Sequence, residues 1–192
     1  MQFLKKQVYF FLAILVASCA APKKTVPESL INTELNEESR ASRKTFYGKL
    51  EEEEYSQIRE MIETELGTSI PEDKAILINF EQYGRNCRKL ILPEENLRSL
   101  IHNIVEISNR ISAEKNTADF FIYTKNVPFK KLYEENESFQ LDPGFFSKNI
   151  FTLHENCSGF FILKTNGEFM KRYGGDYFTH VQNFLNGVEF KK

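Results

Sequence analysis

The chain has 192 residues, and its 25 Lys and Arg residues nearly balance 27 Asp and Glu residues, which gives a formal net charge of −2 at pH 7. A nucleic-acid-binding domain usually carries a strongly basic surface, so this balance argues against a nucleic-acid partner. The 18 Phe and 8 Tyr residues supply enough apolar surface for one core. The length favours a single folded domain.

The N-terminus carries the first informative pattern. Lys5 and Lys6 precede an apolar run at residues 8–17, and small residues then lead to Cys19. The run is too short to span a bilayer, because a spanning helix takes about 20 residues. This order of basic, apolar and small residues before a cysteine resembles a bacterial lipoprotein signal.

The resemblance implies that residues 1–18 are removed and that Cys19 is lipidated, which attaches the chain to a lipid bilayer. It places the protein in the bacterial cell envelope, and Ala20 directly after the cysteine favours the outer membrane. An ordinary secretory signal that ends near the same cysteine is the alternative. Residues 19–45 are polar and include two prolines, so we predict a flexible tether before a folded domain at residues 46–192.

The domain is predicted to begin with a helix, because apolar residues recur at helical intervals up to Leu66 and Gly67 supplies a stop signal. Alternating strand and helix patterns follow, and an Asn-Gly turn marks a hairpin near the end. The predicted elements after the first helix are a buried strand at 74–80, an amphipathic helix at 93–111, a second buried strand at 118–124, a short helix at 128–135, hairpin strands at 159–164 and 168–173, and a helix at 176–185.

This order predicts the fold class. A buried strand, a crossover helix and a second buried strand favour a parallel βαβ unit, and a hairpin with a final helix completes the sheet. The expected architecture is an α/β sandwich, in which a central mixed sheet is flanked by helices and preceded by an N-terminal helix.

Two stretches resemble the membrane-anchored thioredoxin-like thiol-disulfide reductases of the bacterial envelope. In that family a strand is followed by a Cys-x-x-Cys motif and, five residues later, by a proline. The strand that ends at Phe80 and the position of Pro93 match this spacing. Arg85 and Arg88 stand at the two cysteine positions, and Cys87 takes the third position of the motif. The resemblance implies a thioredoxin-like sandwich whose redox motif is lost.

The second stretch is the hairpin. Counting back from its turn places Ser158 where the family has a cis-proline, directly after Cys157. In a thioredoxin fold the loop at this point passes over the start of the first crossover helix, which implies that Cys157 can approach Cys87. A structural disulfide, two separate thiols and a reversible redox couple all remain open, because the sequence does not give the distance between the two residues.

Cys87 could also act alone. A helix N-terminus flanked by Arg85 and Arg88 lowers a cysteine pKa, since the helix dipole and both cations favour the thiolate. The same two arginines are candidates for contact with an anion or a partner, although a solvated pair is the ordinary interpretation.

Other chemistry is not indicated. No His or Cys spacing matches a zinc pattern, and no phosphate loop or nucleophile motif is present, so we expect no metal and no cofactor. The aromatic segment with Phe145, Phe146 and Phe151 is interpreted as core, and any exposed part of it would mark a partner surface. The sequence favours an envelope lipoprotein whose degenerate, non-redox thioredoxin-like domain serves binding or assembly with another envelope protein. The alternative is a thiol-disulfide oxidoreductase that uses Cys87 with Cys157.

Overall fold

The computed structural model describes residues 31–175 and 178–188 of the chain. The predicted signal, Cys19 and the first part of the predicted tether lie outside the described residues, so lipidation stays a prediction. Within the described part, no helix combines the length and the apolar character needed to cross a membrane.

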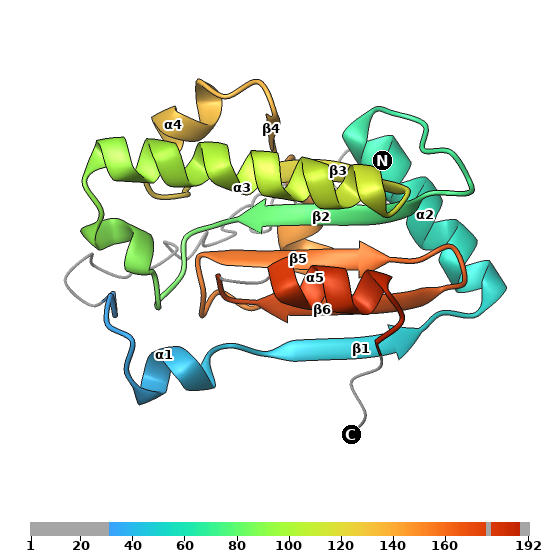
Figure 1. Cartoon of the computed structure of the whole chain (residues 1–192), viewed down its shortest axis with the longest axis horizontal. Helices are drawn as coiled ribbons and strands as arrows, with labels where there is room; N and C mark the ends of the chain where they lie inside the picture. Colours follow the sequence, from blue (N-terminus) through green and yellow to red (C-terminus); the bar gives the residue numbers. More distant parts are fainter. Residues whose placement is uncertain (1–30, 176–177, 189–192) are drawn as a thin grey trace, which may run out of the picture.

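One mixed sheet organises the described residues, with the strand order β1-β6-β5-β2-β3-β4 (Figure 1). The pairs β2–β3 and β3–β4 are parallel, and the other neighbours are antiparallel. The strands are β1 (Thr45–Lys49), β2 (Ala75–Glu81), β3 (Thr117–Tyr123), β4 (Phe139–Leu141), β5 (Ser158–Leu163) and β6 (Glu168–Tyr173). The predicted α/β class with a central mixed sheet is confirmed.

Helices cover both faces of this sheet. They are α1 (Glu37–Ala41), α2 (Glu52–Leu66), α3 (Glu94–Glu114), α4 (Lys130–Glu134) and α5 (Phe178–Leu185), together with a 3₁₀ turn η2 (Arg88–Ile91) and a π-helical turn η3 (Phe146–Ile150). Figure 1 shows α3 and α5 on one face of the sheet, while α2 lies on the other. The core clusters agree, because α2 and η3 share one cluster with the sheet and α3 and α5 share another.

The central strand shows why this sandwich forms. All seven residues of β2 are buried, because β3 and β5 pair with its edges and helices cover its faces. Ile76 and Ile78 face the α2 side, and Leu77 faces the α3 side. A strand buried on both faces is continuously apolar, which is the pattern that predicted it.

Helix α2 ends where the sequence predicted. Gly67 follows it in the left-handed conformation, with φ of 64°, where a side chain would add strain. Arg59, a buried residue of α2, donates hydrogen bonds to the carbonyl oxygens of Ile70 and Pro71 at 2.8 and 2.6 Å. The buried arginine therefore ties α2 to the loop that leads into β2.

Residues 31–45, expected to belong to the tether, pack against the domain. Asn36 caps α1 by accepting a hydrogen bond from the Ser39 backbone N–H at 3.0 Å. Strand β1 then pairs with β6 and forms one edge of the sheet. These elements depend on polar side chains and backbone pairing, so they lack the apolar periodicity that marks a strand or helix in a sequence.

Candidate functional site

Cys87 and Cys157 form a disulfide, with sulfur atoms 2.13 Å apart and Cα atoms 5.3 Å apart. The bridge joins the loop after β2 to the residue that precedes β5. Cys87 is 1% exposed and Cys157 is 7% exposed. The sequence left open a structural bridge, a redox couple, two separate thiols and a lone reactive Cys87. The bond excludes the last two for this structure, whereas a structural bridge and a redox couple both agree with it.

The N-terminal segment is hydrogen-bonded to the loop that contains Cys87. The Cys87 backbone N–H donates to the Asn32 carbonyl at 2.9 Å, and the Asn32 N–H donates to the Arg85 carbonyl at 2.8 Å. Asn86 in turn pairs with the segment before β5, through its backbone N–H to the Glu155 carbonyl at 2.8 Å. Three chain segments therefore run side by side at the disulfide.

The two bridged loops also touch directly. A Cβ atom added to Gly84 would lie 2.2 Å from the carbonyl carbon of Asn156, so only glycine allows the backbones to come this close. The side-chain amide of Gln82 donates to the Leu153 and Asn156 carbonyls at 2.7 and 2.9 Å. These contacts hold the loops together in addition to the covalent bond.

A buried carboxylate lies next to the bridge. Glu81, at the end of β2, is 3% exposed, and its Oε2 accepts a hydrogen bond from Lys89 Nζ at 2.5 Å. The hydroxyl groups of Ser158 and Tyr133 donate to the same oxygen at 3.2 and 3.4 Å. A buried charge needs such partners, and the Glu81–Lys89 pair connects β2 to η2. The sequence did not indicate this pair, because Lys89 follows Glu81 across an irregular loop.

A second acid, Asp119, is partly buried between β3 and α3. Burial raises the pKa of Asp119 to about 7, and hydrogen bonding with Ser108 and Asn79 acts in the opposite direction. Asn79 Nδ2 donates to Asp119 Oδ1 at 2.6 Å. Ser112 also lowers the pKa by hydrogen bonding, but desolvation outweighs these contacts and favours the protonated form below about pH 7.

Arg85 and Arg88 do not lie at the start of the crossover helix. Helix α3 begins at Glu94, and the two arginines flank Cys87 in the preceding loop and η2. Arg85 forms an ion pair with Glu38 at 3.2 Å, and Arg88 is exposed. The geometry gives no helix N-terminus for an anion, so the anion or partner contact of this pair stays a prediction.

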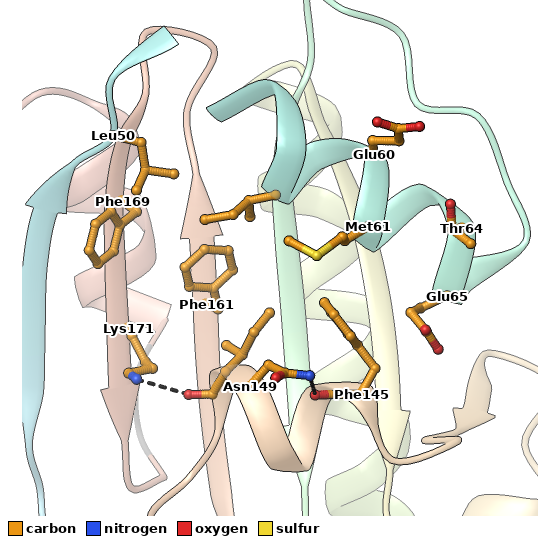
Figure 2. A pocket seen from close by; sticks show the side chains of 12 residues that line it. Leu50, Glu60, Met61, Thr64, Glu65, Phe145, Asn149, Phe161, Phe169 and Lys171 are labelled. Carbon is orange, nitrogen blue, oxygen red and sulfur yellow. Dashed lines mark hydrogen bonds between the residues drawn. The ribbon is translucent and has the colours of Figure 1, made fainter. Parts of the chain in front are cut away.

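An apolar groove with a volume of about 710 Å³ opens between α2, η3 and the strands β5 and β6. In Figure 2, Phe161 and Phe169 project into it from β5 and β6, Met61 from α2, and Phe145 from the segment before η3. Phe146 and Phe151 are buried, as expected for core, whereas Phe145 is only partly buried. The exposed part of the aromatic segment therefore contributes to this groove.

No family model matches the chain, and no curated protein is similar to it. Among solved structures, the thioredoxin domain of a thiol-disulfide oxidoreductase from Bacteroides vulgatus is similar, with a TM-score of 0.38 and 17% identity over 60% of this chain and 81% of that chain. A likeness at this level does not identify an activity. The architecture itself, in which the unit β2–α3–β3 is followed by the hairpin β5–β6 and α5 in one mixed sheet, is consistent with a thioredoxin-like fold.

Proposed function

We propose that this protein is an envelope lipoprotein, anchored in the bilayer through Cys19, whose thioredoxin-like domain binds a partner and does not exchange disulfides. The observation that carries the proposal is the buried bridge between Cys87 and Cys157. Disulfide exchange requires a thiolate to reach one of the two sulfurs, and burial of both cysteines blocks that approach.

The chemistry around the bridge supports the same conclusion. The bridge joins cysteines that are 70 residues apart in sequence, so it closes a long loop of the chain. Hydrogen bonds from Gln82 hold the same two loops together in addition to the bridge. A bridge in this setting acts mainly as a cross-link, which stabilises the domain by restricting the unfolded chain.

The apolar groove supports the binding role. Its walls are mostly apolar, and a volume of about 710 Å³ is within the size range of ligand sites. The predicted partner is another component of the envelope, to which a lipid anchor would give access.

A redox couple is the second candidate, and Glu81 is the observation that favours it. The Ser158 hydroxyl that donates to Glu81 belongs to the residue next to Cys157, so a buried carboxylate lies close to the bridge. A carboxylate in that place has the chemistry to accept or deliver a proton when a disulfide is reduced.

Thiol trapping separates the two candidates. The full chain in a non-ionic detergent is treated with dithiothreitol at neutral pH and then with a maleimide reagent, both folded and in urea. We expect labelling of Cys87 and Cys157 only in urea, and no turnover in a disulfide-reductase assay. Rapid labelling of the folded chain, with reductase turnover that Cys87→Ser abolishes, would refute the non-redox role.

A further inference from the structure

The apolar groove contains one positive charge. Lys171 lies on β6 among the lining residues and is partly buried. Its Nζ donates to the Ile150 carbonyl at 2.8 Å and lies 5.1 Å from the centroid of the Phe46 ring. Among the described residues, no carboxylate forms an ion pair with Lys171, and burial lowers its pKa below the usual value.

An ammonium group in this position lacks a counter-charge. It has three N–H donors, of which the Ile150 carbonyl takes one, and a partly buried cation is stabilised by an anion. The acidic lining residues do not supply it, because Glu60 and Glu65 lie on α2, across the groove from Lys171 in Figure 2. The groove thus combines apolar walls with one cation at one side.

The polar groups of the groove do not suit a peptide backbone. A bound peptide needs partners for its own N–H and C=O groups, and sheet edges commonly supply them. Both β5 and β6 have a strand neighbour on each side, so neither offers an open edge. The Asn149 amide is already used, since it donates to the Phe145 carbonyl at 2.9 Å. An alkyl chain needs no hydrogen-bond partners.

We propose that the groove binds a free fatty acid, with the carboxylate at Lys171 and the alkyl chain against Phe161, Met61 and Phe145. Apolar walls with a single well-placed polar group are typical of small-molecule sites, and the volume of about 710 Å³ lies within their range. The assignment rests on the proposed binding role, and it specifies the chemistry of the ligand.

Photo-crosslinking tests it on the full lipidated chain in phosphatidylcholine nanodiscs. The probe is palmitic acid that carries a diazirine and a terminal alkyne, and the labelled peptides are identified by mass spectrometry. We expect labelling of peptides that contain Met61 or Phe145, and untagged palmitic acid should compete. Lys171→Met should reduce this labelling about tenfold, the loss expected when a charge-assisted hydrogen bond is removed. Lys148→Met, on the exposed side of η3, is the matched control and should have no effect.

The corresponding fatty alcohol, with the same two tags, distinguishes the loss of the charge interaction from a loss of folding in the Lys171→Met variant. It should label the groove weakly and equally in the original chain and in Lys171→Met, which also shows that the variant is folded. Labelling away from the groove, equal labelling by acid and alcohol, or equal behaviour of the two lysine variants would overturn the fatty-acid assignment. Thiol trapping on the same sample tests the non-redox role separately. If the bridge is inert but the probe does not label the groove, only the fatty-acid assignment is rejected.

Discussion

Replacement of Asp119 by asparagine should change how the stability of the fold depends on pH. The folded-state pKa of about 7 lies above the usual value of 3.8, so the folded chain retains a proton that the unfolded chain releases. The stability contributed by this group is therefore complete below about pH 4 and is lost as the pH rises towards 7. The asparagine side chain keeps the shape of the aspartate and its acceptor for Asn79, but it does not titrate.

The size of the effect follows from the difference between the two pKa values. A separation of about 3 units, at about 1.4 kcal/mol per unit, corresponds to roughly 4 kcal/mol between pH 4 and pH 7. The Asp119→Asn variant should match the original chain near pH 4. At pH 8 it should be more stable by up to that amount, because the original chain then holds an ionised carboxylate in a partly buried, desolvated place.

Urea unfolding followed by far-UV circular dichroism at intervals from pH 4 to pH 8 measures this difference in the full chain. Glu114→Gln removes a similar charge from an exposed position at the end of α3 and serves as the matched control. A difference between Asp119→Asn and the original chain that stays constant across this range would refute the reasoning, as would a variant that is less stable at pH 8.

Three further changes test the region of the bridge, each by urea unfolding. Alanine at both bridged cysteines should cost about 4 kcal/mol, the loop-entropy value for a separation of 70 residues, and an unchanged midpoint would contradict it. Gly84→Ala should cost more than about 2 kcal/mol through its backbone clash, whereas Gly175→Ala, with open space around it, should be close to neutral. Glu81→Gln should cost about 3 kcal/mol by leaving Lys89 without its counter-charge, and adding Lys89→Met should recover part of the loss; no recovery would argue against the pair.

The sequence predicts the central part of the fold well, because a strand that is buried on both faces is apolar along most of its length. The apolar run of β2, the amphipathic pattern of α3 and the Asn-Gly turn between β5 and β6 each identify an element. Strand β1 was missed because it lies at the sheet edge, where four of its five residues are exposed and no apolar alternation is required.

The candidate site was harder to predict than the fold. The likeness to thioredoxin-like reductases suggested that Cys87 and Cys157 approach each other, but spacing alone gives no distance between residues so far apart. The segment at Asn32 binds the loop of Cys87 through backbone hydrogen bonds, and these cannot be predicted from the hydropathy of the sequence. The environments of the buried Glu81 and the partly buried Asp119 are made by neighbours from other elements, so they form only once the chain is folded.

The place where the chain enters the domain has a mechanical consequence. With an anchor at Cys19, any pull between membrane and domain would reach the described structure at its first residues, where Asn32 is hydrogen-bonded to the loop of Cys87. That loop is joined covalently to Cys157, directly before β5, which pairs with the central strand β2. The hydrogen bonds at Asn32 would therefore have to break before the load travelled along the chain to the edge strand β1.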